Sequence, residues 1–192
     1  MQERNNDKYL VVISGPSGSG KDTIAERLLI DNNNMSLSVS YTSRKKRDYE
    51  VDGVHYFFTS REKFLEMKEK GLMLETVEYN GNYYGTPLPE LYEKLESKKT
   101  VILVIDVKGA MRVKELFPEA LLVFIVPPSM EELEERLKKR STETEDDLKS
   151  RMEIAKHEMT FMDDYNVIMV NDEVDKCKEQ LLIEIKKWQD TH

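Results

Sequence analysis

A glycine-rich run directly after an apolar segment constrains this chain more than any other feature. The run is Gly15-Pro16-Ser17-Gly18-Ser19-Gly20-Lys21, with the spacing G-x-x-x-x-G-K. The segment Tyr9–Ile13 before it predicts a strand, and the apolar spacing from Ile24 to Leu29 predicts a helix after it. A Gly/Ser-rich turn can exist without a ligand. Strand, loop, lysine and helix together instead predict a P-loop, which binds phosphates with backbone N–H groups and its lysine.

The residue after Lys21 departs from this motif. That position normally carries Ser or Thr, whose hydroxyl binds Mg²⁺, but here it is Asp22, and the hydroxyl follows at Thr23. A carboxylate can bind Mg²⁺ directly, yet it also repels nucleotide phosphates at close range. The sequence leaves open which effect is larger, so Asp22 and Thr23 are both candidate Mg²⁺ ligands.

The bulk properties predict a single soluble domain over residues 1–192. The net charge of −8, from 37 acidic and 29 basic residues, argues against a general nucleic-acid binder. The longest apolar run, Leu121–Val126, is too short to span a bilayer, and residues 2–8 show no signal-peptide pattern. The one cysteine, Cys177, leaves no intrachain disulfide. We therefore expect a cytoplasmic protein with no membrane and no nucleic-acid partner.

Strand-like and helix-like patterns alternate along the chain. Strands are predicted at Leu10–Ser14, Ser36–Tyr41, Thr100–Ile105, Leu121–Val126 and Val167–Val170. Helices are predicted at about Lys21–Ile30, Val107–Leu116, Ser129–Arg140, Glu145–Met162 and Glu173–Asp190. The last three strands are nearly all apolar, which suits a parallel sheet covered on both faces. The pattern predicts an α/β fold with a three-layer α/β/α core and a parallel sheet.

Two segments do not fit this alternation. Residues of about 42–98 are rich in tyrosine and charge and predict a small inserted subdomain of mixed α+β structure, between core segments of about 1–41 and 99–192. The second is the arginine- and lysine-rich piece at about 136–151. Capping boxes are predicted at Thr59 with Glu62 and at Ser129 with Glu132, where helices would begin.

The basic run Arg44-Lys45-Lys46-Arg47 follows a predicted strand. Taken alone, it is typical of a solvated turn or a short localisation tract. In a P-loop protein, however, the group that receives the phosphoryl needs a second anion site. Two arginines close in sequence can clamp a terminal phosphate with bidentate hydrogen bonds.

Further candidate ligand groups come from three other places. The segment Asn82–Thr86 predicts either an ordinary aromatic hairpin or a site where Tyr84 donates to phosphate and Thr86 to a base or sugar. Glu75 is either a surface residue or a carboxylate that reads the adjacent N1–H and 2-amino donors of guanine. Asp106 ends an apolar strand, where it would cap the next helix or bind Mg²⁺ or substrate.

Together these residues resemble the guanylate kinases, the P-loop enzymes that convert GMP and ATP to GDP and ADP. The likeness runs from Leu10 to about Lys187 in the family's order and spacing. Its elements are the P-loop, Ser40 with Arg44 and Arg47, Glu50-Val51-Asp52-Gly53 with Tyr56, Glu75, Asn82-Tyr83-Tyr84-Gly85-Thr86, Asp106, and Arg140-Ser141-Thr142-Glu143. The resemblance implies that segment 42–98 is the NMP-binding subdomain and segment 136–151 the lid.

The resemblance also implies a role for each matching position. The P-loop, Lys21 and Arg140 would hold ATP with Mg²⁺, and Asn171 would lie on the adenine side. The GMP phosphate would be bound by Arg44, Arg47, Tyr56 and Tyr84, and guanine by Ser40, Glu75, Thr86 and Asp106. Charge on the transferring phosphoryl would be neutralised by Lys21, Arg44, Arg136, Arg140 and Arg151. The GMP phosphate is already anionic, so no dedicated base is needed.

Three positions depart from the family pattern. Asp22 stands where Ser or Gly is usual, Val104 occupies a strand position that is commonly acidic, and Ser141 replaces a lid glycine. The loss at Val104 removes one support for the Mg²⁺ hydration shell. One hypothesis is that Asp22 replaces that support from across the site.

Two other functions compete with this interpretation. Ribose bisphosphate phosphokinases resemble guanylate kinases and can carry Asp after the P-loop lysine, but they are not expected to keep the full set Arg44, Arg47, Tyr56 and Glu75. A non-catalytic guanylate-kinase-like binding module would have lost P-loop residues, whereas Gly20 and Lys21 are present here. The expected partners are ATP and GMP or dGMP, and the expected state is a monomer or homodimer.

Overall fold

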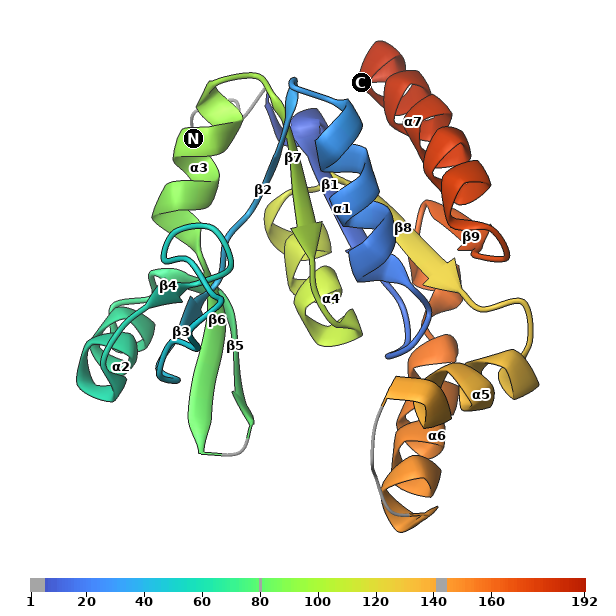
Figure 1. The fold of residues 1–192 in the computed structure, drawn as a ribbon. Coiled ribbons are helices and arrows are strands. Elements are labelled where there is room, and N and C mark those ends of the chain that lie inside the picture. The colour runs from blue at the N-terminus through green and yellow to red at the C-terminus, as the bar shows by residue number, and fades with distance from the viewer. Residues whose placement is uncertain (1–5, 80, 141–144) are drawn as a thin grey trace.

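A five-stranded sheet forms the centre of the molecule (Figure 1). The computed structural model describes residues 6–79, 81–140 and 145–192, without the side chains of residues 79 and 140. In spatial order the strands are β2 (Met35–Leu37), β7 (Thr100–Val104), β1 (Leu10–Ser14), β8 (Leu121–Val126) and β9 (Val167–Val170). All neighbouring pairs are parallel, as the apolar, β-branched strand sequences predict.

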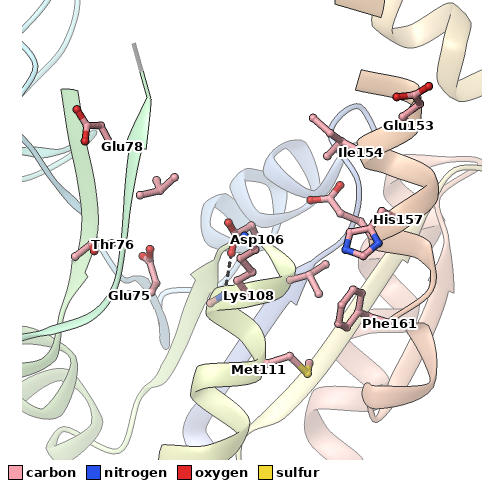
Figure 2. A pocket seen from close by; sticks show the side chains of 14 residues that line it. Glu75, Thr76, Glu78, Asp106, Lys108, Met111, Glu153, Ile154, His157 and Phe161 are labelled. Carbon is pink, nitrogen blue, oxygen red and sulfur yellow. Dashed lines mark hydrogen bonds between the residues drawn. The ribbon is translucent and has the colours of Figure 1, made fainter. Parts of the chain in front are cut away.

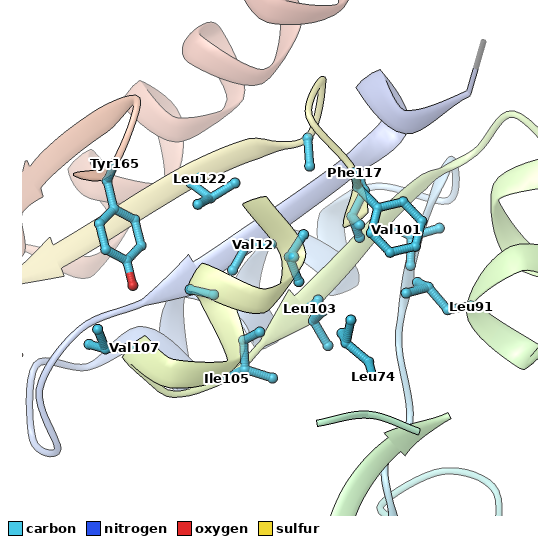
Figure 3. Close-up of a cluster of buried hydrophobic side chains, with 14 of the residues drawn as sticks. Val12, Leu74, Leu91, Val101, Leu103, Ile105, Val107, Phe117, Leu122 and Tyr165 are labelled. Carbon is cyan, nitrogen blue, oxygen red and sulfur yellow. The ribbon is translucent and has the colours of Figure 1, made fainter. Parts of the chain in front are cut away.

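Helices cover both faces of this sheet. On one face lie α1 (Lys21–Asp31) and α7 (Val174–Thr191), and on the other α3 (Leu88–Glu96) and α4 (Val107–Leu116). Alternate side chains of β1 serve the two layers: Val11 packs with α1 and α7, whereas Val12 packs with α3 and α4. Figure 3 shows the second cluster, where Val12 lies near Leu103 and Leu122. The predicted three-layer α/β/α core is confirmed.

The segment that lies between β2 and β7 in sequence forms a second, four-stranded sheet. Its strands in spatial order are β4 (Phe57–Phe58), β3 (Tyr41–Thr42), β6 (Asn82–Pro87) and β5 (Met73–Tyr79). The helix α2 (Arg61–Glu69) buries Phe64, whose ring stacks on Tyr83 of β6 with centroids 5.5 Å apart. Mixed strand and helix structure in this segment is therefore confirmed, and Figure 1 places it to one side of the main sheet.

The arginine- and lysine-rich segment spans the end of one helix and the start of the next. These helices are α5 (Met130–Arg140) and α6 (Glu145–Met159), and residues 141–144 between them lie outside the described residues. Ala155 of α6 packs against Leu133 and Leu137 of α5. Two short 3-10 helices, Asp7–Tyr9 and Met162–Asp164, complete the elements. The exact division into core, insertion and lid stays a prediction.

Three sequence predictions need correction. The single strand predicted at Ser36–Tyr41 is wrong: β2 ends at Leu37 in the main sheet, and the chain then crosses to begin β3 in the small sheet. The cap of α2 is Ser60 instead of Thr59, because the Ser60 side chain accepts the Lys63 N–H. The third concerns β9, which is an edge strand of the main sheet with 49% of Ile168 exposed, so helices do not cover both of its faces.

The carboxyl ends of the parallel strands meet along one edge of the main sheet. The P-loop follows β1, Asp106 follows β7, and Asn171 follows β9. In open α/β sheets this edge is where ligands bind. The insertion lies beyond one side of this edge and helices α5 and α6 beyond the other (Figure 1). Among the described residues, no helix has both the length and the apolar character needed to cross a bilayer.

Candidate active site

The P-loop owes its shape to two glycines that other residues could not replace. Gly15 has φ +138°, and a Cβ there would lie 2.1 Å from the Ile125 carbonyl oxygen at the end of β8. Gly20 has φ +90°, and a Cβ there would lie 2.2 Å from the Asn171 amide nitrogen. Both positions combine a left-handed backbone with a close neighbour, so only glycine fits without displacement. The loop is thereby held against strands β8 and β9.

Helix α1 begins at the end of this loop, and no side chain caps its first N–H groups. Its N-cap is Gly20, which has no side chain to accept the first N–H groups of the helix. Lys21 is the first helical residue, and its Nζ lies 3.5 Å from the Pro16 carbonyl oxygen within the same loop. A helix N-terminus with an adjacent ammonium group favours an anion. The predicted polyphosphate site therefore has its expected local geometry.

Asn171 connects the P-loop to the end of β9. Its Nδ2 donates to the Ser19 carbonyl oxygen at 2.8 Å, and the residue is 2% exposed. Among the described residues, the Asn171 Oδ1 and the Ser19 hydroxyl are buried without a hydrogen-bond partner. Buried polar atoms without partners are rare in native proteins. These two atoms therefore point to a ligand or water at this end of the loop.

A cavity of about 270 Å³ opens beside Asn171. It is lined by Gly18, Gly20, Arg136, Lys139, Asn171, Asp172 and Val174. Arg136 is held there by two bonds, from Nε to a Glu132 carboxylate oxygen at 2.9 Å and from Nη2 to the Asn171 carbonyl oxygen at 3.2 Å. Arg136 thus lies on the side of the P-loop predicted for adenine.

Helix α6 reaches the other side of the P-loop. Arg151 Nη2 donates to the Ser17 hydroxyl at 2.8 Å. Glu158 lies two turns further along the same face and is half-buried. Burial raises the pKa of the Glu158 carboxyl, while Lys21 and the Ser17 N–H oppose that rise. Arg151 of α6 therefore contacts the P-loop, and Glu158 of α6 interacts with Lys21 and Ser17 of the same loop.

The insertion contributes a compact cluster of aromatic and charged groups. The Arg44 guanidinium lies 5.7 Å from the Tyr56 ring centroid, and the rings of Tyr56 and Tyr84 are 5.9 Å apart. Arg44 Nη2 and Nη1 donate to the two carboxylate oxygens of Glu50 at 2.6 and 3.0 Å. This bond to Arg44 lowers the pKa of Glu50 to about 2. Burial raises the pKa of Tyr56, so its hydroxyl stays protonated and able to donate.

Three of the four predicted phosphate ligands meet in this cluster, and the fourth lies at its rim. The Arg47 guanidinium is exposed and donates to the Tyr49 hydroxyl at 2.7 Å, while its backbone N–H donates to Glu50 at 2.7 Å. Ser40 lines a cavity of about 530 Å³ together with Tyr56 and Glu50. Ser40 therefore lies on the phosphate side of the site, apart from the other residues predicted to bind guanine.

The other predicted guanine ligands line or support a larger cavity of about 1050 Å³ (Figure 2). Glu75 of β5 faces Asp106 at the start of α4 across this space. The Thr86 hydroxyl and N–H both donate to Glu75 Oε1, at 2.8 and 3.1 Å. Asp106 caps α4 by accepting the Gly109 N–H at 2.8 Å. Burial raises the pKa of Glu75, and the nearby Asp106 charge adds to the rise.

This geometry modifies the predicted role of Thr86 and the predicted arrangement of the Mg²⁺ ligands. Thr86 is fully buried and its hydroxyl proton is already given to Glu75, so Thr86 orients the carboxylate. Asp106 shares its cavity with Glu75, whereas Asp22 lines the other cavity with Tyr56 and Val104. Of the three predicted Mg²⁺ ligands, Asp22, Thr23 and Asp106, the two carboxylates therefore line different cavities. The roles of all these residues stay predictions.

Comparison with known proteins places the chain in a family. The family model described as guanylate kinase matches residues 7–187. A guanylate kinase from Desulfitobacterium hafniense is 44% identical over 183 residues, covering 93% of this chain and 92% of that protein. One from Halalkalibacterium halodurans is 46% identical over 172 residues, covering 90% and 84%. The chain belongs to the guanylate kinase family.

Solved structures agree with this membership. The crystal structure of guanylate kinase from Anaplasma phagocytophilum superimposes with a TM-score of 0.72 at 32% identity, covering 94% of this chain and 85% of that one. A shikimate kinase from Bacteroides thetaiotaomicron matches with a TM-score of 0.51 at 16% identity, which shows the shared fold alone. The chain is therefore a nucleoside monophosphate kinase of the guanylate kinase family with the fold of P-loop kinases.

The sequence did not reveal two residues, Glu50 and Glu158, as residues of the site. Glu50 was part of a matching motif but received no role, because its contacts with Arg44 depend on folding of the loop. Glu158 carried no motif at all. The one available signal for Glu158 was its spacing of seven residues from Arg151, which puts both side chains on one helix face. The Arg140 side chain and residues 141–144 lie outside the described residues.

Proposed function

We propose that this chain transfers the γ-phosphoryl group of ATP to GMP and dGMP, giving ADP and the guanosine diphosphate. The observation that carries the proposal is the partly buried Glu75 carboxylate, fixed by two bonds from Thr86 and open to the cavity that Asp106 also lines. Such a carboxylate accepts the N1–H and 2-amino donors of guanine. Adenine offers no donor pair at these positions, so it would shield the Glu75 carboxylate from water and leave it unpaired.

The acceptor phosphate belongs in the cluster of Arg44, Tyr56 and Tyr84. Arg44 presents a planar guanidinium whose orientation is already set by Glu50, and both tyrosines lie beside it. Arg47 has only to turn its guanidinium away from Tyr49 to add a second positive charge. The cluster thereby suits the terminal phosphate of a nucleoside monophosphate.

The transfer itself needs positioning and charge neutralisation. An oxygen of the GMP phosphate forms a bond to the γ-phosphorus of ATP, and the bond from that phosphorus to the β-phosphate oxygen breaks. Lys21 and the α1 N-terminus hold the donor phosphates, and Arg151 is already at the loop. We propose that Arg44, Arg136 and Arg140 complete this neutralisation when the insertion and lid close over the substrates.

The oxygen donors near the P-loop fit Mg²⁺. Mg²⁺ is usually bound by one or two carboxylates together with substrate phosphates and water, so it needs no closed protein cage. Asp22 offers an exposed carboxylate in the first turn of α1, and Thr23 follows with a hydroxyl. We propose that the ion lies beside Asp22 and Thr23 and is held mainly by the ATP phosphates and water, while Asp106 lies in the other cavity. When bound, Mg²⁺ neutralises charge on the donor phosphates.

A coupled assay of ADP release tests this function. ATP and Mg²⁺ are supplied with GMP, dGMP, AMP, UMP or a ribose bisphosphate as the acceptor. We expect turnover with GMP and dGMP only. Turnover confined to the ribose bisphosphate would contradict the proposal. Folded protein that releases no ADP with any acceptor would contradict it as well. Gel filtration of the same sample tests the proposed monomer or homodimer.

A further inference from the structure

A buried carboxylate lies inside a cluster that is proposed to bind an anion. Glu50 is 5% exposed and faces the same cavity as Tyr56. A negative charge at this position repels a phosphate dianion, and burial of a charge is unfavourable unless partners compensate it. Phosphate repulsion and the cost of burying a charge both disfavour Glu50 as a simple lining residue, so its contacts must serve another purpose.

Those contacts fix the two arginines in different ways. Glu50 accepts both terminal nitrogens of Arg44, a fork-on-fork pair that sets the plane of the guanidinium. It also accepts the backbone N–H of Arg47 at 2.7 Å, while its own N–H donates to the Arg47 carbonyl oxygen at 3.1 Å. The loop from Arg47 to Glu50 is thus closed by bonds in both directions.

The outer side of Arg44 is left for the substrate. Nη1 also donates to the Lys45 carbonyl oxygen at 2.7 Å, so three N–H groups of the guanidinium are bonded within the loop that runs to Glu50. A guanidinium has five such donors. The Tyr84 side chain interacts electrostatically with the same group, and the Tyr56 ring lies over it. Arg44 is therefore turned so that its remaining edge lies among the proposed phosphate ligands.

We propose that Glu50 is a positioning residue for the acceptor phosphate, which orients Arg44 and closes the loop that carries Arg47 before substrate binds. The inference deepens the proposed function and rests on it, since it names how that phosphate subsite is built. The charge and the orienting contacts of Glu50 have opposite expected effects on GMP binding. By charge alone, removal of Glu50 strengthens GMP binding, whereas by orientation it weakens GMP binding.

The test is steady-state kinetics of E50Q, which keeps the shape of the side chain and removes its charge. We expect the KM for GMP to rise roughly 10- to 100-fold, the loss typical of hydrogen bonds to a charged group. The KM for ATP is expected to stay within about threefold, because the P-loop is not touched. A KM for GMP that is unchanged or lower overturns the inference.

Two controls separate positioning from a general weakening of the insertion. E66Q makes the same change of charge in the exposed ion pair of Glu66 with Lys70 and is expected to leave the KM for GMP unchanged. Guanosine, which lacks the phosphate, is expected to inhibit E50Q and the unaltered enzyme with equal inhibition constants. A parallel rise in the guanosine constant overturns the inference, because the defect then lies outside the phosphate subsite.

A double-mutant cycle with R44K completes the design. Lysine keeps the charge of Arg44 but cannot form the fork, so E50Q is expected to have a much smaller effect in that background. Equal effects in both backgrounds contradict an orienting role. If E50Q does not fold, E50D carries the same test, with an expected rise of several-fold because its carboxylate is one methylene shorter. Absence of GMP-dependent ADP release from the unaltered chain is a failure of the proposed function, whereas normal turnover with an unchanged KM in E50Q is a failure of this inference alone.

Discussion

The molecule builds its two proposed phosphate sites in different ways. On the core side, the P-loop uses backbone N–H groups whose directions depend on glycines such as Gly15 and on the uncapped start of α1. On the insertion side, the cluster uses side chains, with Arg44 held by Glu50 and flanked by tyrosines. A backbone site is fixed once the loop folds, whereas a side-chain site needs supporting contacts. We therefore expect a substitution that displaces the backbone to impair the first site, and one that removes a supporting side chain to impair the second.

The largest effect is expected from Gly15→Ala on the backbone side. A Cβ there would lie 2.1 Å from the Ile125 carbonyl oxygen at a φ of +138°, so the loop must move. Displacement of a binding group by about 1 Å can lower a rate about 100-fold, and we expect a fall in kcat/KM for ATP of at least that order. Gly71→Ala is the matched control, because Gly71 has φ +67° but nothing within 4 Å. A Gly15→Ala enzyme with normal ATP kinetics would show that the loop does not depend on this glycine.

A smaller effect is expected from Glu75→Gln on the side-chain side. The amide can accept only one of the two guanine donors and presents its own donor to the other. We expect kcat/KM for GMP to fall about 30- to 100-fold, with less effect on IMP, which lacks the 2-amino group. The ratio of GMP to IMP turnover is the measurement. A ratio that is the same in both enzymes would remove Glu75 from guanine recognition.

Asp22→Ser tests whether the P-loop side also relies on a side chain. We expect turnover within about threefold of the unaltered enzyme, or higher, because a hydroxyl at this position suits Mg²⁺ and repels phosphate less. Initial rates are measured over a series of Mg²⁺ concentrations. A collapse in rate together with a raised Mg²⁺ requirement would instead show that Asp22 has become a necessary metal ligand.

The smallest effect concerns stability without catalysis. The bond to Arg44 lowers the pKa of Glu50 to about 2 from an ordinary value of 4.5. A lowered folded-state pKa contributes stability above pH 4.5, and this contribution is lost as the pH falls toward about 2. We therefore expect the difference in melting temperature between the unaltered enzyme and E50Q to shrink over that pH range. A constant difference would mean that the Glu50 charge does not contribute.

Local patterns predicted the core better than they predicted the insertion. The bounds of β1, β8, β9 and α4 follow directly from apolar runs and helical spacing, because each is one continuous element in one layer. The segment Ser36–Tyr41 has an equally continuous pattern, but it divides between two sheets, and no local signal shows where a chain changes sheet.

The candidate site divides in the same manner. The P-loop was readable because its function depends on residues that are adjacent in sequence. Roles in the insertion came from resemblance. The support of Arg44 by Glu50 depends on the fold of one loop, and that of Glu75 by Thr86 on the pairing of β5 with β6, and neither is encoded in a local motif. The exposed position of Arg47 beside Tyr49 likewise depends on a rotamer, which the sequence does not specify.

The bond between Arg151 and Ser17 has a thermodynamic consequence of its own. A guanidinium from α6 that contacts the P-loop couples two equilibria, the docking of the helix and the binding of nucleotide to the loop. By reciprocity, any free energy that ATP gains or loses by altering this contact is returned in equal measure to the docking of α6. Substitutions on the face of α6 that points away from the P-loop should therefore change the affinity for nucleotide, although they do not contact it.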